Sequence, residues 1–133
     1  MATRKYSRQR ESIREYLSST YEHPTAETVY LNVKNEYPNI SLGTVYRNLN
    51  LLADTGEALK INTPYGGDRF DGHTHPHYHF CCTRCGKVLD LQLEQLDTIN
   101  KVAEQAIDGI VESHTMMFYG ICGDCTSKHE QLF

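Results

Sequence analysis

Long apolar runs are missing from this sequence. No stretch of its 133 residues approaches the roughly 20 consecutive apolar residues that a membrane-spanning helix needs. The opening residues, MATRKYSRQRES, lack the apolar segment of a secretory signal. Low-complexity tracts are also absent, and 39% apolar with 23% charged residues is typical of a folded protein. We therefore expect a cytoplasmic protein with one domain or two very small ones.

A strong basic excess, typical of nucleic-acid binders, is also absent, because the net charge is -4. The charge is unevenly spread. Residues 1–66 carry eight Lys and Arg against seven Asp and Glu, whereas residues 67–133 carry five against ten. Several basic side chains lie close to the N-terminus: Arg4, Lys5, Arg8, Arg10 and Arg14. A local basic patch can therefore form on an acidic whole.

The first half predicts three helices, which begin after the side-chain caps Ser7, Thr25 and Ser41. The third helix is the clearest, and Gly56 would end it. Its apolar stripe consists of Leu42, Val45, Leu49 and Leu52. EALKINT and RFD then read as two strands around the turn PYGGD. Three helices followed by a hairpin predict a winged helix, whose last helix enters the major groove of DNA.

Polar side chains of the third helix are candidates for DNA contact. Arg47 and Asn50 can bind base edges or phosphates, and Tyr46 can pack against a thymine methyl group. Arg14, in the basic N-terminal region, is a fourth candidate. The alternative is that these are ordinary solvated residues on amphipathic helices, and the pattern alone leaves both interpretations open.

The second half predicts an α+β unit. HYHF and KVLDLQL read as strands, LEQLDTINKVAEQAIDG as an amphipathic helix, and IVESHTMMFYGIC as a β-rich run. The apolar positions of that helix are Leu93, Leu96, Ile99, Val102 and Ile107. One helix over a small sheet has little core, so we expect a structural metal or dimerisation to stabilise this unit.

Two CxxC motifs lie in the second half. Four thiolates arranged in two pairs complete the tetrahedral shell of a structural zinc site. The candidate zinc ligands are Cys82, Cys85, Cys122 and Cys125. A redox function of one CxxC lacks the strand-to-helix context that it requires. Cys81 remains, and we favour a packing residue over the alternative of a reactive thiol.

A second set of metal ligands is rich in histidine. His77 and His79 would share one face of a predicted strand, with a carboxylate on either side and a further histidine in the first half. The candidate ligands are His23, Asp71, His77, His79 and Asp90. Three imidazoles with two carboxylates suit Fe(II) or Mn(II). The alternative is a solvated histidine-rich loop. For His73 and His75 the choice lies between accessory ligands and solvated side chains, and we favour the latter.

The motifs HPTAETVY, ISLGTVYRNL, RFD, HYHFCCTRCGKVLD and YGICGDC together resemble the ferric uptake regulator (Fur) family of metal-dependent repressors. The resemblance implies a winged-helix DNA-binding domain over residues 1–70, a hinge over 71–75, and a dimerisation and metal-binding domain over 76–133. It implies structural zinc in the four cysteines and a regulatory metal in the second set. A homodimer would bind double-stranded operator DNA with palindromic half-sites.

Within the family, the chain looks most like the peroxide-sensing members. Asp90 stands where iron-sensing members usually have Glu, and Pro76 and Tyr78 occupy positions of a further metal site, which leaves His114 without partners there. The resemblance implies that iron and hydrogen peroxide oxidise His23 and His77, which releases DNA. A repressor that senses only iron, zinc or manganese is the alternative. A hydrolase is disfavoured, because no general base is evident, so we expect no enzyme.

Overall fold

The computed structural model describes residues 7–91 and 93–126. The described residues form two compact units, one within Met1–Thr74 and the other within His75–Phe133. The hinge predicted over residues 71–75 stays a prediction, and Asp71 belongs to the last strand of the first unit. None of the described helices is long and apolar enough to cross a membrane.

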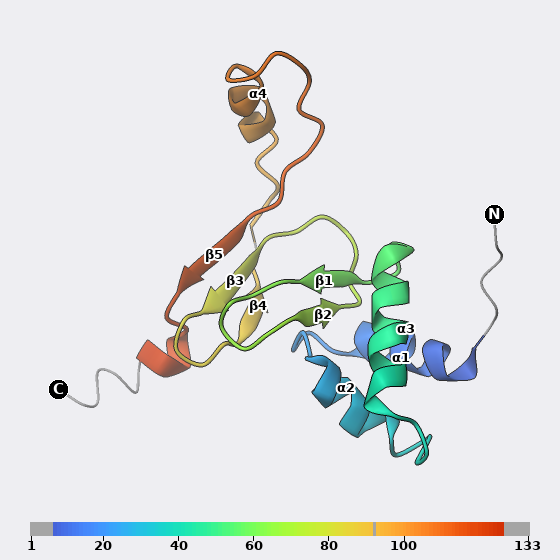
Figure 1. The fold of residues 1–133 in the computed structure, drawn as a ribbon. Helices are drawn as coiled ribbons and strands as arrows, with labels where there is room; N and C mark the ends of the chain where they lie inside the picture. Colours follow the sequence, from blue (N-terminus) through green and yellow to red (C-terminus); the bar gives the residue numbers. More distant parts are fainter. Residues whose placement is uncertain (1–6, 92, 127–133) are drawn as a thin grey trace. The chain divides into compact units, whose positions relative to one another are not determined.

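The first unit has the order helix, helix, helix, strand, strand (Figure 1). Its elements are α1 Arg8–Ser19, α2 Ala26–Val33, α3 Leu42–Asp54, β1 Leu59–Ile61 and β2 Arg69–Asp71. All three predicted caps are confirmed, because the side chains of Ser7, Thr25 and Ser41 accept backbone hydrogen bonds from the first turns. Strands β1 and β2 pair antiparallel. The predicted winged-helix fold is confirmed.

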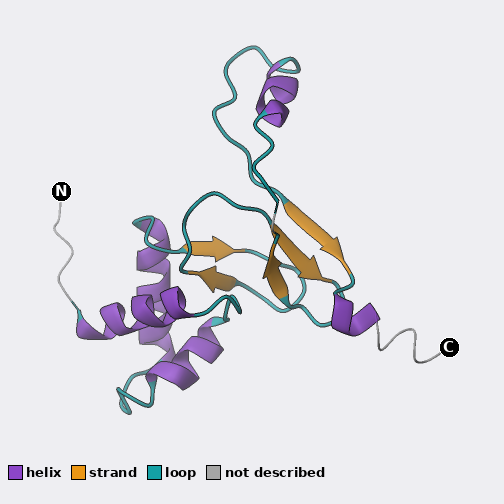
Figure 2. Ribbon diagram, turned by 180° about the vertical axis from the view of Figure 1, so that it is seen from behind, coloured by secondary structure: helices purple, strands orange, loops and turns teal. Residues whose placement is uncertain are grey.

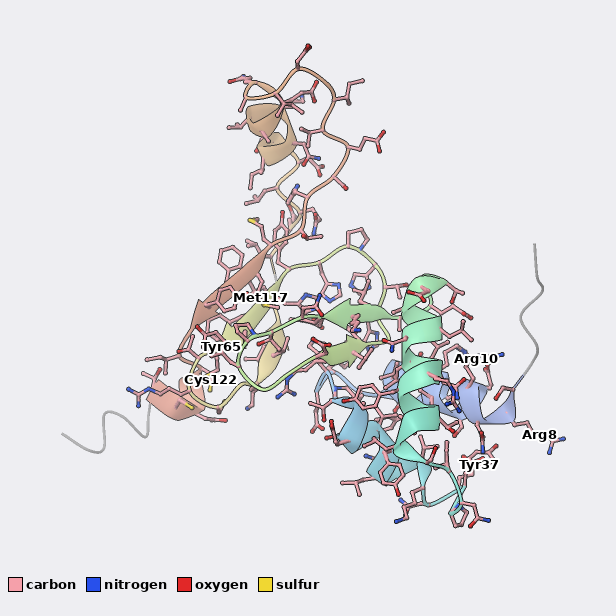
Figure 3. The ribbon with its side chains drawn as sticks, in the orientation of Figure 1. Arg8, Arg10, Tyr37, Tyr65, Met117 and Cys122 are labelled. Carbon is pink, nitrogen blue, oxygen red and sulfur yellow. The ribbon has the colours of Figure 1, made fainter. Side chains whose placement is uncertain are left out.

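One apolar cluster forms the core of the first unit. Val45, Leu49 and Leu52 of α3 are fully buried in it, whereas Leu42, predicted for the same stripe, is exposed at the start of the helix. A polar contact also joins two helices, because Arg10 of α1 extends toward α3 (Figure 3) and donates a hydrogen bond to the buried amide oxygen of Asn48. Packing of these side chains into the core therefore decides which face of α3 is exposed.

The second unit contains a three-stranded sheet with the strand order β4-β3-β5 (Figure 2). Its elements are β3 His79–Cys82, β4 Val88–Asp90, α4 Thr98–Glu104 and β5 Met117–Gly120. Strand β3 pairs antiparallel with β4 and parallel with β5. The predicted strand over HYHF begins only at His79, so His77 lies in the loop before it.

Helix α4 does not cover the sheet of its unit, which corrects the prediction. Figure 1 shows α4 at the end of a long excursion between β4 and β5, away from the three strands. The helix has only seven residues and none of them is buried. Four of its predicted apolar positions are exposed, namely Leu93, Leu96, Val102 and Ile107. The apolar stripe was therefore recognised, but it has no partner within the described part of the chain.

Candidate metal sites and nucleic-acid interface

The zinc-ligand candidates meet at one end of the three-stranded sheet. Cys82 ends β3, and Cys122 follows β5 (Figure 3). Parallel pairing places Cys82 opposite Gly120, two residues before Cys122. The turn after β3 is also bonded to β5, because the Thr83 N–H donates to the Gly120 carbonyl at 2.7 Å. Strand pairing thus brings together two CxxC motifs that are far apart in sequence.

The four sulfur atoms have the spacing of a tetrahedral site. They all lie within 4.8 Å of one another, and the Cys85 and Cys122 sulfurs are 3.8 Å apart. Zinc–sulfur bonds of about 2.3 Å give tetrahedral sulfur–sulfur edges of about 3.8 Å. The four cysteines therefore fit a structural zinc ion. Cys81, the fifth cysteine, is fully buried in the sheet and lies outside this group.

Hydrogen bonds shift the pKa values of two of the thiols in opposite directions. Backbone N–H groups of Cys85 and Cys122 donate to the Cys82 sulfur and lower the pKa of Cys82 to about 6. Hydrogen bonding to the Cys122 side chain, with burial, raises the pKa of Cys125 to about 12. Four adjacent thiolates repel one another, and a divalent cation removes this obstacle because it binds all four in their charged form.

Three candidates for the regulatory metal lie together in the second unit. The register of β3 and β4 places His79 directly opposite Asp90, so their side chains meet on one face. Asp90 Oδ1 lies 3.4 Å from His79 Nε2 and 2.9 Å from His77 Nε2. Metal bonds of about 2.1 Å leave two ligand atoms of one ion roughly 3 to 4 Å apart. The spacing of these three side chains therefore fits a metal ion.

The orientation of His77 also fits a metal ligand. Its Nδ1 lies 2.6 Å from the His75 carbonyl oxygen. Because a carbonyl only accepts hydrogen bonds, Nδ1 must carry the proton, and the lone pair of the neutral ring is then on Nε2. That lone pair faces a carboxylate oxygen of Asp90, so two acceptors point at each other and repel. A cation bound between them makes this arrangement favourable. A backbone partner on the non-ligating nitrogen is typical of metal-bound histidine.

The two remaining ligand candidates form a pair in the first unit. His23 and Asp71 are both fully buried, with His23 Nδ1 3.8 Å from Asp71 Oδ2. Asp71 Oδ1 also accepts a hydrogen bond of 2.8 Å from the backbone N–H of His73. His73 is not simply solvated, because its ring stacks on Tyr21 and bonds to the Thr20 carbonyl. His75 is exposed.

Each unit thus carries its own group of nitrogen and oxygen ligands, and this chemistry fits Fe(II) or Mn(II). The structure brings His23 to Asp71 within the first unit, and His77 and His79 to Asp90 within the second. The joining of both groups around one ion stays a prediction.

Two of the predicted DNA-contact residues are exposed side by side on α3. The Tyr46 hydroxyl donates a hydrogen bond of 3.2 Å to Glu27 of α2. Desolvation and, second to it, this hydrogen bond raise the pKa of Tyr46 above its usual value. Arg47 donates to the Thr44 hydroxyl at 3.1 Å. Both side chains are therefore held by neighbours on the exposed face of α3, and their contact with DNA stays a prediction.

The other two candidates lie in different surroundings. Asn50 is half-buried and accepts a hydrogen bond of 3.1 Å from Lys60 of β1. Arg14 lies on α1, where its guanidinium bonds to Glu11, and this bond raises the pKa of Arg14. Lys60 is a basic group next to α3 that the sequence analysis missed. No motif in the sequence indicates that the β1 side chain of Lys60 contacts Asn50 of α3.

His114 has partners that the sequence analysis did not foresee. Its Nδ1 donates to the Asn100 side-chain oxygen at 2.7 Å, and its Nε2 accepts from the hydroxyl of fully buried Tyr78. The Tyr78 oxygen in turn accepts a hydrogen bond of 2.8 Å from the Leu96 N–H. This network joins the α4 segment to the residue just before β3. Nothing in the spacing of Tyr78, Asn100 and His114 predicts it.

A winged-helix unit followed by a small sheet with two kinds of metal-ligand group defines the class of metal-dependent DNA-binding regulators. The comparisons with known proteins agree. The profile of the ferric uptake regulator family matches residues 2–119. The chain belongs to the ferric uptake regulator family.

Relatives within this family include a peroxide-responsive repressor, PerR, of Staphylococcus aureus. The chain is 40% identical to it over 120 residues, which cover 90% of this chain and 81% of the relative. A solved peroxide stress regulator of Campylobacter jejuni is 33% identical, with a TM-score of 0.76 and 88% of each chain covered. The ferric uptake regulator Fur of Helicobacter pylori, described as having three functional metal-binding sites, is 26% identical, with a TM-score of 0.81 over 92% of this chain and 82% of that one.

Proposed function

We propose that this protein is a cytoplasmic, metal-dependent transcriptional repressor that responds to hydrogen peroxide. The observation that carries the proposal is the 40% identity to PerR over 90% of the chain, combined with the nitrogen and oxygen ligand groups of the two units. The second unit would form a homodimer through its exposed apolar side chains, and two winged helices would bind palindromic half-sites. Tyr46, Arg47, Asn50 and Arg14 would contact the DNA.

The regulatory step requires one ion that is bound by both units. His23 and Asp71 would bind it from the first unit, and His77, His79 and Asp90 from the second. Because the ion would bind well only when the two groups meet, its binding would favour one arrangement of the DNA-binding domains. Without the ion, other arrangements compete, and operator affinity falls.

The response to peroxide would depend on His23 and His77. Fe(II) held by these ligands would supply the redox chemistry by which one oxygen atom of hydrogen peroxide is added to the imidazole of His23 or His77, while the other leaves as water. An oxidised imidazole is a weaker ligand, so the two units separate and the DNA is released. Mn(II) reduces peroxide far more slowly, so repression would persist with Mn(II) in the same ligands.

The ligand inventory favours this proposal over a repressor that senses iron alone. Among residues 7–91 and 93–126, possible metal ligands gather only in the cysteine group and in the histidine and aspartate groups. His114 is bonded to Tyr78 and Asn100, so a third site like that described for the Helicobacter pylori regulator has no support from these side chains.

The test is to load the dimer with Fe(II) or Mn(II), add hydrogen peroxide, map oxidised peptides by mass spectrometry and measure operator binding. We expect oxygen on His23 and His77 with iron, together with loss of DNA binding, and neither change with manganese. Unmodified histidines with retained DNA binding under iron would show instead a repressor that senses metal alone. Substrate turnover without metal-dependent DNA binding would favour a hydrolase.

A further inference from the structure

The backbone of the loop that carries His23 is unusual. With φ at 53°, His23 is the one non-glycine residue of positive φ in the described parts of the chain. L-amino acids rarely adopt this left-handed region. Pro24 adds a second constraint, because a residue before proline favours an extended backbone. A conformation of this kind persists only where surrounding contacts hold it, and it is common at functional sites.

Strand β2 supplies two contacts that hold this loop. Arg69 Nη1 donates a hydrogen bond of 3.1 Å to the carbonyl oxygen of His23. The next residue, Phe70, donates its N–H to the carbonyl of Pro24 at 3.0 Å. Phe70 belongs to the apolar core and is fully buried, so the strand position is fixed by packing. Arg69 therefore attaches the strained peptide of His23 to a strand that the core holds in place.

The same strand positions the carboxylate partner. Asp71 follows Phe70 on β2 and lies with its Oδ2 3.8 Å from His23 Nδ1. The chain then passes so close to α1 that a Cβ on Gly72 would lie 2.6 Å from the backbone carbon of Leu17. Both ends of the His23–Asp71 pair thus depend on β2 and its close fit to the helix.

The Arg69 side chain is a costly way to make one backbone hydrogen bond. Its Nε is buried and has no hydrogen-bond partner among the described residues, which is unfavourable for a buried donor. The bond to the His23 carbonyl is made although it leaves this donor unsatisfied. This arrangement is consistent with a role in which the geometry of His23 matters.

We propose that Arg69 is a positioning residue for the regulatory metal. It holds His23 in the left-handed conformation, so that the imidazole and the Asp71 carboxylate form a two-ligand cradle before the ion binds. Ligands that are already ordered bind more tightly, because less conformational freedom is lost on binding. Without Arg69, His23 relaxes toward the extended backbone that Pro24 favours, and its imidazole leaves the cradle. The role of the ion in this inference rests on the proposed function.

The test compares Arg69→Met with Lys60→Met in the zinc-loaded full chain. Lys60 is a suitable control, because it lies on the neighbouring strand β1 and contacts Asn50 and Asp68 rather than the His23 loop. One readout is the Cα and Cβ chemical shifts of His23 in the protein without regulatory metal. The other is the dissociation constant of Mn(II), measured by electron paramagnetic resonance.

In Arg69→Met we expect the His23 shifts to move to values typical of an extended backbone. The Mn(II) dissociation constant should rise by about tenfold or more, as is common when a residue that orients a metal ligand is lost. In Lys60→Met the shifts should stay, and the dissociation constant should change by less than about twofold. Zinc content and the thermal midpoint of the first unit show whether each variant is folded.

Arg69→Lys is the second variant, and it decides the matter if Arg69→Met does not fold. It keeps the charge but not the planar guanidinium, so we expect smaller changes in the same direction. Unchanged His23 shifts in the folded variants would overturn the proposal, as would shifts that move with no change in Mn(II) affinity. If the native chain itself binds no Mn(II), the proposed function fails, whereas the His23 shifts still show whether Arg69 holds the loop.

Discussion

Eleven buried apolar side chains form one cluster in the first unit, and all of them lie between Ile13 and Phe70. The buried side chains described in the second unit are fewer, and apart from Val88 they are aromatic rings and thiols, among them Tyr78, His79, Cys82 and Cys122. Large apolar side chains of the second unit are exposed instead, including Leu93, Val102, Ile107 and Ile110. The first unit is thus stabilised by its own core, whereas we expect the second to need a metal ion, its polar network and a partner.

Zinc removal should give the largest difference between the units. Cys122→Ser removes one thiolate from the four-sulfur group, and zinc binding in small zinc domains supplies about 10–16 kcal/mol of folding free energy. We expect the backbone amide signals of the second unit to collapse to unfolded positions while those of the first unit remain, as measured by heteronuclear NMR.

Cys81→Ala is the matched control, because Cys81 lies outside the zinc group although it is equally buried. It should keep one zinc ion per chain and a folded second unit. Simultaneous loss of both units in Cys122→Ser would contradict the independence of the first core.

A cavity in the core should have the next largest effect, now confined to the first unit. Leu49→Ala removes a fully buried side chain of α3, and such changes cost about 2–5 kcal/mol. Leu31→Ala, at a position that is 64% exposed, should change the free energy of unfolding by less than about 0.5 kcal/mol. Urea denaturation followed by circular dichroism gives both values, and equal values would refute a localised core.

Removal of the Tyr78 hydroxyl tests the polar network of the second unit. Tyr78→Phe deprives the Leu96 N–H and His114 Nε2 of their shared partner, and a buried polar group left without a partner costs about 1–3 kcal/mol. Hydrogen exchange of the α4 segment should accelerate accordingly. Tyr21→Phe, which alters an exposed hydroxyl in the first unit, should leave that exchange unchanged. Slow exchange in Tyr78→Phe would show that the network does not anchor α4.

The extent to which the sequence predicts the structure also differs between the units. Helix caps act over three residues, so Ser7, Thr25 and Ser41 were predicted correctly. The cysteine group followed from the ligand chemistry of CxxC pairs. The exposure of α4 could not be predicted in this way. A stripe of apolar residues shows that a helix has an apolar face, but it does not show which surface covers that face.

Contacts between distant residues that belong to no ligand motif were beyond the sequence analysis. The Tyr78–His114 bond depends on side-chain directions that only the fold sets. Arg69 was recognised as part of a strand, but its bond to the His23 carbonyl, across 46 positions, was not. The left-handed backbone of His23 gave no signal either, because histidine followed by proline predicts an extended residue.

Backbone strain at His23 should give the smallest effect. Both His23→Gly and His23→Ala remove the imidazole, but glycine adopts the left-handed conformation without steric cost. After allowance for the greater freedom of unfolded glycine, His23→Gly should be more stable than His23→Ala by about 0.5–1 kcal/mol. Urea denaturation of the two variants measures this difference. A more stable alanine variant would mean that the loop does not retain its conformation once the imidazole is gone.

The proposal that one ion is bound by ligands from both units can be tested by counting imidazoles. The protein is labelled with ¹⁵N-histidine, loaded with Mn(II) and studied by pulsed electron paramagnetic resonance. Coordination by His23, His77 and His79 predicts three coupled imidazole nitrogens in the native chain, and two in each of His23→Ala and His79→Ala. Two nitrogens in the native chain, unchanged by His23→Ala, would show that the first unit does not contribute a histidine and would contradict the account.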